Sequence, residues 1–172
     1  MIKIKIATHK DVEILALLGR VTYSESHGHF INNAEDLYNY NNEAFSIQRT
    51  TEELYKKENI YWIAYLNNFP VGYAKLVLNA DNDSISDQNI CRLERIYVLN
   101  EFLGKKVGYQ LYNTVLDKAK ELKFNQIWLT VYIKNYKAIK FYEKQDFKKV
   151  GDYTFWVNGK AFENYIHSKP IS

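Results

Sequence analysis

Hydrophobic and polar positions alternate most clearly near the middle of the chain, which reads RLERIYVLNEFLGKKVGY from Arg92 to Tyr109. A period of two separates one set of residues (Cys91, Leu93, Arg95 and Tyr97) from the other (Arg92, Glu94, Ile96 and Val98), which predicts a strand. Beyond Glu101, apolar residues recur every three or four positions, as on one face of a helix, at Val107, Leu111, Val115, Ala119 and Leu122. The centre of the chain is therefore expected to be a strand, a short turn and a long helix.

The same patterns predict the elements that precede this centre. Isoleucine alternates with lysine over residues 2–6, as in a half-buried strand. Thr8 and Asp11 have the spacing of a capping box, which opens a helix with an inner face at Val12, Leu15, Leu18 and Thr22. Residues 23–33 lose the apolar period and are expected to end this helix and form a loop. A short helix is expected over residues 34–41, and Thr50 with Glu53 caps another through about Lys57.

The remaining elements are mostly strands. Aromatic and β-branched runs over residues 60–66 and 71–78 are joined by the turn residues 67–70 and predict a hairpin. Residues 80–89 are polar and read as a mobile loop, residues 126–132 as a strand and residues 135–145 as a short helix. Residues 147–157 and 161–169 form a hairpin across Asn158-Gly159, which favours a type I′ turn. The expected fold is α/β (α+β), with a mixed, mostly antiparallel sheet and flanking helices.

Composition narrows the class of protein. The 172 residues are 47% apolar and 25% charged and contain two prolines, so we expect one domain over residues 1–172. Apolar runs are too short for a bilayer and no signal peptide opens the chain, so we expect no membrane partner. Cys91 stands alone, which excludes an internal disulfide and fits a reducing cytoplasm. The net charge of +3 is spread along the chain, which argues against a nucleic-acid surface.

The turn between the central strand and helix has the composition of a phosphate site. It reads LGKKVG, with two glycines and two lysines at the start of the helix. Free N–H groups at a helix N-terminus, the helix dipole and two ammonium groups all favour a bound phosphate. A P-loop is excluded because the G-x-x-x-x-G-K-[ST] pattern is absent.

Two segments, RIYVLNEFLGKKVGYQLY and NYKAIKFYEKQDF, carry a resemblance to the GCN5-related N-acetyltransferases (GNAT). The second matches the family spacing N-x-x-A-x-x-F-Y-x-x-x-G-F at Asn135, Ala138, Phe141, Tyr142 and Phe147. The resemblance covers nearly the whole chain, and TYSESH, LERIYV and KNYKAIKFY are most similar to the PaiA-type spermidine/spermine N-acetyltransferases. It implies a GNAT fold and direct acetyl transfer from acetyl-CoA to a small-molecule primary amine, with a polyamine as the expected acceptor.

The sequence departs from the family pattern at three positions. Leu103 stands where the family's R/Q-x-x-G-x-G/A has Arg or Gln, and Lys106 replaces its first glycine. A lysine can present the same main-chain N–H if its φ is negative. Asp146 replaces the glycine before Phe147 and is expected in the left-handed region. The resemblance still implies cofactor binding along the strand end, turn and helix, at Ile96, Tyr97, Val98, Leu103, Gly104, Lys105, Lys106, Val107, Gly108 and Tyr109.

Acetyl transfer to an amine needs a base, a polarised carbonyl and an acid for the leaving thiolate. Glu94 is the candidate base, although an ion pair with Arg92, Arg95 or a lysine explains it equally well. A main-chain N–H around Val98 would polarise the carbonyl, with Ile96 and Tyr97 lining the pantetheine arm by resemblance. Tyr142 is the candidate proton donor, from its place in the motif. Asn135 is expected to bond the pantetheine amides, to cap a helix, or both.

Several other residues have alternative interpretations. Glu25 and Asp36 are candidates for binding a polycationic amine, although acidic loop residues are usually only solvated. His27 and His29 have no third partner for a metal, so we expect no metal site; they are either exposed or line the acceptor pocket. Cys91 is expected to be a buried apolar residue and not a nucleophile.

The function also has alternatives at this stage. The same chemistry fits a protein N-terminus, a lysine or an aminoglycoside as acceptor. A weakly active acyl-CoA-binding domain with a regulatory role is the non-enzyme alternative, favoured by Lys106 and opposed by Tyr142 and Asn135. The aromatic hairpin after Phe147 is a candidate homodimer interface.

Overall fold

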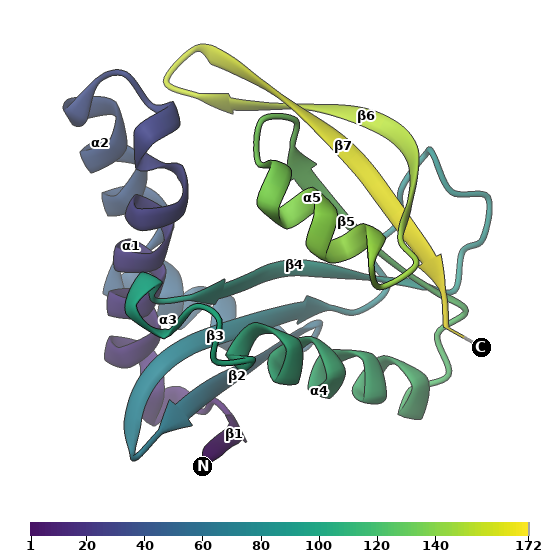
Figure 1. Ribbon diagram of the computed structural model, residues 1–172, viewed down its shortest axis with the longest axis horizontal. Coiled ribbons are helices and arrows are strands. Elements are labelled where there is room, and N and C mark those ends of the chain that lie inside the picture. The colour runs from purple at the N-terminus through teal and green to yellow at the C-terminus, as the bar shows by residue number, and fades with distance from the viewer. Residues whose placement is uncertain (172) are drawn as a thin grey trace. The chain divides into compact units, whose positions relative to one another are not determined.

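The computed structural model describes residues 1–171, whose strands form one seven-stranded sheet in the order β1-β2-β3-β4-β5-β7-β6 (Figure 1). The registered pairs β1–β2, β5–β7 and β6–β7 are antiparallel, whereas β4 and β5 are parallel. The expected mixed, mostly antiparallel sheet with flanking helices is confirmed. The chain divides into two compact units: Met1–Leu76 with Arg95–Val115, and Val77–Glu94 with the chain from Leu116 onward. We describe each unit by itself.

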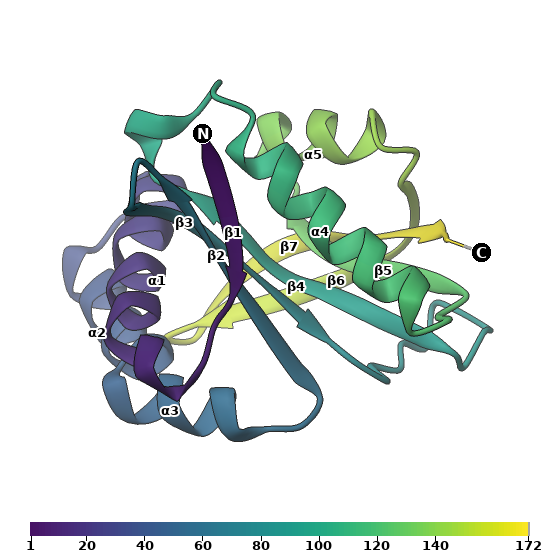
Figure 2. The same cartoon turned by 90° about the horizontal axis from the view of Figure 1, so that it is seen from below.

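The first unit contains β1 (Ile2–Ile6), β2 (Asn59–Leu66), most of β3 (Phe69–Val77) and three helices that pack against one another. The helices are α1 (Val12–His27), α2 (Ala34–Ala44) and α3 (Ile47–Tyr55), grouped together in Figure 2. Leu15 and Leu18 of α1 pack on Tyr61, Ile63 and Tyr73 of β2 and β3. The core of this unit therefore joins one face of α1 to the sheet.

Both ends of α1 agree with the sequence prediction. Thr8 and Asp11 form the predicted capping box, which opens the 3-10 turn η1 (His9–Asp11) directly before α1. The predicted inner face is buried. The helix continues to His27 and is followed by the 3-10 turn η2 (Gly28–Phe30), so it ends within residues 23–33, as expected. The hydroxyls of Ser24 and Ser26 donate to carbonyls four residues earlier, and their polarity is thereby satisfied inside the helix.

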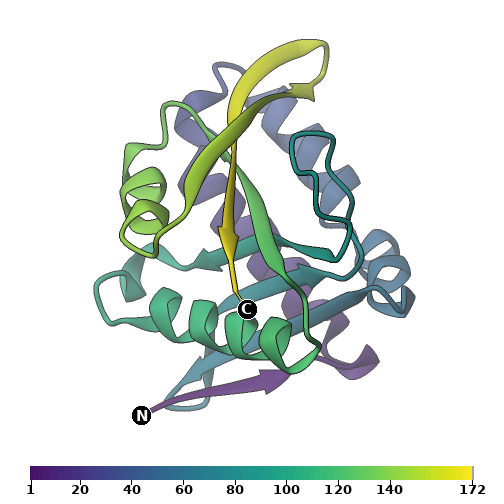
Figure 3. The ribbon, with the colours of Figure 1, turned by 90° about the vertical axis from the view of Figure 1, so that its right-hand side faces the viewer.

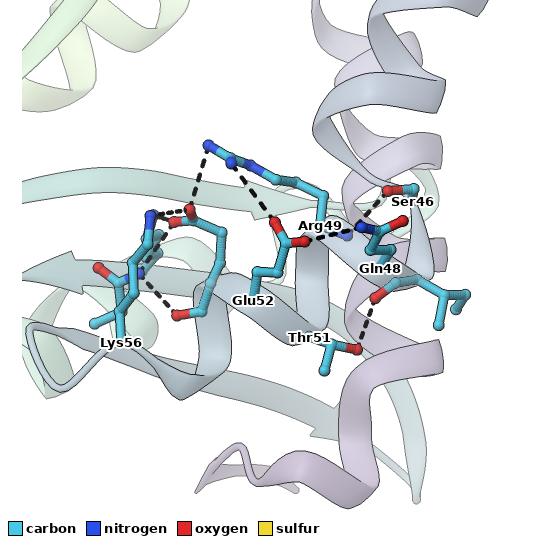
Figure 4. A network of polar contacts seen from close by, with 10 residues as sticks. Ser46, Gln48, Arg49, Thr51, Glu52 and Lys56 are labelled. Carbon is cyan, nitrogen blue, oxygen red and sulfur yellow. Dashed lines mark hydrogen bonds and ion pairs between the residues drawn. The ribbon is translucent and has the colours of Figure 1, made fainter.

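The start of α3 differs from the prediction. Its N-cap is Ser46, whose hydroxyl accepts a hydrogen bond from the Arg49 main-chain N–H at 3.0 Å. Thr50 and Glu53 lie inside the helix and are buried, so their interpretation as a cap was wrong. The Glu53 carboxylate instead accepts from Lys75 Nζ of β3 at 2.7 Å. Figure 4 shows the network of polar contacts along α3, from Ser46 to Lys56.

The second unit contains the start of β4 (Ile90–Val98) together with β5 (Gln126–Tyr132), β6 (Lys148–Val157) and β7 (Lys160–Pro170). The parallel register pairs Ile90 with Gln126, and β7 lies between β5 and β6 (Figure 3). The predicted β6–β7 hairpin is confirmed. Its turn residues Asn158 and Gly159 both have positive φ, as a type I′ turn requires.

The other hairpin is confirmed with a refinement, and the polar segment lacks regular structure, as a loop should. Asn67 and Asn68 have φ of 51° and 68° and form the whole turn, so the residues expected to complete it open β3 instead. Residues 80–89 form no regular element. They are nevertheless anchored, because Trp128 Nε1 donates to the Ala80 carbonyl at 2.7 Å and Ile85 packs on the core formed by Ile90, Trp128 and Ile166.

Helix α4 (Val107–Glu121) follows the central strand as predicted. Val107, Leu111, Val115 and Ala119 are buried, which confirms the predicted apolar face. Leu122 lies beyond the helix and is 40% exposed, so its assignment to that face was wrong. Among the described residues, no helix combines the length and apolar character needed to cross a membrane.

Candidate functional site

The turn before α4 presents main-chain N–H groups at the start of the helix. The 3-10 turn η3 (Asn100–Phe102) follows β4, and Gly104 and Lys106 have φ of 77° and 62°. Gln110 N–H donates to the Lys106 carbonyl at 3.0 Å, which places Lys106 at the N-cap. The N–H groups of the next three residues have no acceptor within an α-helix, so they are available to an anion.

Lys106 occupies the left-handed region. A negative φ was the condition under which we expected lysine to replace glycine, and the structure does not meet it. A left-handed conformation costs a non-glycine residue roughly 1–2 kcal/mol. Lys106 therefore keeps a glycine-like backbone at some cost in stability. Asp146 has φ of 64°, which confirms the left-handed conformation predicted there.

Gly108 leaves the first turn of α4 open. A Cβ added there would lie 3.7 Å from Val98 Cγ2, an ordinary van der Waals contact, and one added at Gly104 would meet nothing within 4 Å. The protein's own packing therefore does not require a glycine at position 108. Leu103 and Tyr109 are partly exposed, at 41% and 46%, and Lys105 Nζ lies 4.9 Å from the Phe102 ring centroid. This surface has room for an incoming anionic group.

The end of β4 is held by a close approach of β3. A Cβ at Gly72 would lie 2.6 Å from the Tyr97 carbonyl oxygen, so only glycine fits there without a shift. Leu99 N–H donates to the Val71 carbonyl at 3.0 Å. Ile96, Tyr97 and Val98 are half-buried at this strand end. The residues predicted to line the pantetheine arm are thus fixed in one backbone position.

The residues predicted to bind the acceptor come from α1 and α2. Glu25 Oε2 accepts a hydrogen bond from the Asn100 main-chain N–H at 2.8 Å, so one of its oxygens is bonded to the turn after β4. Asp36 is half-buried in the first turn of α2. Glu25 therefore links α1 to the turn after β4, which its sequence context did not indicate.

His27 is half-buried and not exposed, whereas His29 is exposed as expected. The His27 ring stacks on Tyr23 at 4.7 Å between centroids and meets the Tyr97 ring edge-on at 5.9 Å. Burial, with a smaller contribution from His29, lowers the pKa of His27 to about 4. Within residues 1–171, no group of three His, Cys, Asp or Glu side chains is arranged to hold a metal ion.

In the second unit, Glu94 pairs with Arg92 at 3.6 Å between carboxylate and guanidinium. The Arg92 guanidinium lies 4.8 Å from the Trp128 ring centroid, and its Nη2 donates to Thr130 Oγ1 at 3.4 Å. The ion-pair interpretation of Glu94 is therefore present in the structure. This was one of the two interpretations left open from the sequence, and the assignment of Glu94 as the base stays a prediction.

Tyr142 lies in α5 (Tyr136–Glu143), and Asn135 directly precedes this helix. Tyr142 is buried, with its ring edge-on to Phe141 and Phe147 at 5.3 and 5.7 Å. Asn135 is the N-cap, since its side-chain oxygen accepts from Ala138 N–H at 3.2 Å. Its amide NH₂ is the group that would donate to a ligand. Cys91 is buried, and burial raises the pKa of its thiol to about 12, as a structural cysteine requires.

Comparison with known sequences assigns the chain to a protein family. The profile of the Acetyltransferase (GNAT) family matches residues 30–147. The chain belongs to this family. An uncharacterized N-acetyltransferase in the pepI 3′ region of Lactobacillus delbrueckii subsp. lactis is 24% identical over 171 residues, covering 99% of this chain and 98% of that protein. This GNAT chain is an acetyltransferase, and acetyl-CoA is the acetyl donor of its family.

Solved GNAT structures have the same fold. The PaiA N-acetyltransferase of Thermoplasma acidophilum, in complex with coenzyme A, has a TM-score of 0.77 at 21% identity, covering 99% of each chain. The spermidine/spermine N-acetyltransferase SpeG of Vibrio cholerae, in mutant forms, has a TM-score of 0.70 at 16% identity, covering 99% of this chain and 94% of SpeG. At these identities the likeness establishes the fold alone.

The residues present fit a coenzyme A diphosphate. The open helix start offers main-chain N–H donors, a side-chain-free surface at Gly108 and two adjacent ammonium groups. Sequence reasoning found this segment from its glycines and lysines. It missed Gly72, whose role depends on a neighbouring strand, and the pairing of Ser26 with His27, for which the only signal was their adjacency in TYSESH.

Proposed function

We propose that this GNAT acetyltransferase transfers the acetyl group of acetyl-CoA directly to a primary amine of a polyamine such as spermidine or spermine, in a ternary complex. The use of acetyl-CoA is supported by the first turn of α4, which has main-chain N–H donors and no side chain at Gly108. The acceptor class is supported by the structural likeness to PaiA and to a spermidine/spermine acetyltransferase. Both partners are small molecules.

The cofactor would be held by main-chain donors and by the strand end. The N–H groups of Val107, Gly108 and Tyr109 would bind the diphosphate, with Gly104 shaping the turn and the two lysines adding charge. The pantetheine arm would lie along Ile96 to Val98, and the Asn135 amide would donate to it. Acetyl-CoA supplies the acetyl group on an activated thioester.

The amine must lose a proton before it attacks, since alkyl ammonium groups titrate near ~10.4. Glu94, whose carboxylate lies 3.6 Å from the Arg92 guanidinium, would accept this proton directly or through a water. The Val98 main-chain N–H would stabilise charge on the carbonyl oxygen. A C–N bond forms and the C–S bond breaks. The nitrogen becomes cationic on attack and would lose its second proton to solvent, and the Tyr142 hydroxyl would give its proton to the leaving sulfur. The proton taken by Glu94 returns through solvent to Tyr142, so the enzyme is regenerated.

The acceptor's charge would be met by carboxylates of the first unit. Glu25 has Oε2 bonded to Asn100, so its second oxygen is the one that would face an ammonium group. Asp36 lies in the first turn of α2 and would bind the distal ammonium of the polyamine. Opposite charge at these positions favours a polycation over a neutral amine.

A panel of amines tests this proposal. Thiol release from acetyl-CoA is measured with spermidine, spermine, an aminoglycoside, a lysine peptide and an N-terminal peptide. Release confined to the polyamines supports the proposal, and release confined to a peptide or aminoglycoside replaces its acceptor. Tight binding of acetyl-CoA with no amine-dependent release would instead indicate a regulatory acyl-CoA-binding domain.

A further inference from the structure

Ser26 determines which nitrogen of His27 carries the proton. Ser26 Oγ lies 2.7 Å from the Thr22 carbonyl oxygen and 3.3 Å from the Tyr23 carbonyl oxygen. Carbonyls only accept, so the single hydroxyl proton of Ser26 is directed at them. Ser26 Oγ must then accept from the imidazole, whose Nδ1 lies 2.7 Å away. Nδ1 of His27 therefore bears the proton and Nε2 bears the lone pair.

The His27 ring is neutral and fixed in orientation. Burial lowers the pKa of its imidazole to about 4, so the neutral form dominates at pH 7. The ring stacks on Tyr23 with an interplanar angle of 8°. Together with the bond to Ser26, this stacking holds the plane of the ring and the direction of Nε2. A neutral imidazole in this tautomer accepts one hydrogen bond at Nε2 and does not repel a cation.

His27 lies next to the end of β4 that we assign to the acetyl group. Its ring is edge-on to Tyr97 at 5.9 Å, and Tyr97 directly precedes Val98. Two residues earlier on α1, Glu25 binds the Asn100 main-chain N–H. The last turn of α1 is therefore attached to this end of the strand at two points, both within the first unit.

We propose that Nε2 of His27 accepts a hydrogen bond from the N–H of the acceptor amine and thereby directs the amine lone pair toward the acetyl group. This role rests on the proposed function and adds a residue that touches the acceptor. In this proposal His27 orients the amine and does not take its proton. The base remains Glu94.

Three variants test this role through the kinetics of the acceptor. His27→Phe keeps an aromatic ring on Tyr23 and removes the lone pair. It should lower kcat/KM for spermidine by about 10- to 100-fold and leave the Kd of acetyl-CoA unchanged within about twofold. His27→Gln restores an acceptor oxygen near the Nε2 position and should recover part of the activity. His29→Phe, at an exposed neighbour, should behave as wild type.

A ¹⁵N NMR measurement tests the same inference without turnover. In the coenzyme A complex, Nδ1 of His27 should be protonated at pH 7, and added spermidine should shift the Nε2 resonance. Ser26→Ala should populate the other tautomer and lower kcat/KM for the amine. A protonated Nε2 in the wild type, no spermidine-dependent shift, or wild-type kinetics in a folded His27→Phe enzyme would each overturn the inference. Absence of wild-type turnover on every amine would refute the proposed function instead, and the NMR result would still decide the inference.

Discussion

Glu25 Oε2 lies 2.8 Å from the main-chain nitrogen of Asn100, although the two residues are 75 positions apart in sequence. The carboxylate comes from the last turns of α1, and the N–H opens η3, the turn that leads from β4 toward α4. A carboxylate at the N-terminal end of a helical turn satisfies a donor that the turn leaves unpaired. This one bond connects the acceptor-side helix to the segment that carries the phosphate-binding turn.

Removing the Glu25 carboxylate should therefore loosen this connection. We expect Glu25→Ala to lower the free energy of unfolding by about 1 kcal/mol, the usual value of a helix cap, and to raise KM for a polyamine. Urea unfolding measures the first effect. Asn100→Pro is the matched control, because it removes the donor while Leu99, at φ −53° and ψ 138°, has the conformation that precedes proline. Additive losses in the double variant would show that the two groups do not interact.

Lys106→Gly should stabilise the protein and preserve cofactor binding. Glycine adopts the left-handed conformation of Lys106 without strain, so we expect a gain of about 0.5–1 kcal/mol in the free energy of unfolding. Titration calorimetry should find acetyl-CoA binding weakened by only a few-fold. Lys106→Ala is the control, since it removes the ammonium group but keeps the strain. Complete loss of binding in both variants would show that the lysine side chain, and not the main chain, holds the phosphates.

Tyr142→Phe should separate catalysis from binding. Phenylalanine occupies nearly the same volume beside Phe147 but has no proton to give. We expect kcat to fall by about 100-fold or more, within the range of a general acid, while the Kd of acetyl-CoA stays nearly unchanged. Tyr136→Phe, at an exposed position of the same helix, is the control. Unchanged turnover in Tyr142→Phe would remove this residue from the mechanism.

Glu53 makes the stability of the protein depend on pH in acid. Burial alone would raise the pKa of Glu53, but hydrogen bonds from Lys56 and Lys75, with their charges, lower it to about 2. A pKa depressed in the folded state contributes stability that is complete above the unfolded value and is lost as the pH falls toward the folded value. The contribution should therefore disappear between about pH 4.5 and pH 2.

Glu53→Gln tests this pH dependence. It leaves Lys75 buried beside a neutral partner, so we expect it to destabilise the protein by about 3 kcal/mol at pH 7. Urea unfolding at a series of pH values should show the difference from wild type shrinking as the pH falls below about 4.5. A difference that does not vary with pH would indicate a loss of packing instead of a loss of charge.

Local pattern was enough to predict most of the fold. The alternation in residues 2–6 predicted a strand at its observed limits, as did the reading of residues 126–132, and Asn158-Gly159 predicted its turn. The errors occurred where tertiary contacts override local signals. Thr50 and Glu53 have the spacing of a capping box, but Glu53 is directed to Lys75, a residue of β3 that no local pattern connects with it.

Tertiary contacts also limit how much of the candidate site local sequence pattern can indicate. Tyr142 and Asn135 were assigned roles from their spacing in a motif, and these roles stay predictions, whereas the helix N-cap at Asn135 is visible in the sequence. The left-handed φ of Lys106 was not, since lysine does not favour that region. Nor was the bond between Glu25 and Asn100, because it depends on where α1 ends relative to a turn 75 residues later.

Product analysis with spermidine tests the central claim most directly. Purified protein is incubated with acetyl-CoA, with and without spermidine, and the reaction is followed by mass spectrometry and thiol release. The account predicts monoacetylated spermidine, formed in equal amount to the thiol released and at a rate far above hydrolysis of acetyl-CoA alone. Thiol release that is the same with and without spermidine, with no acetylated product, would contradict it.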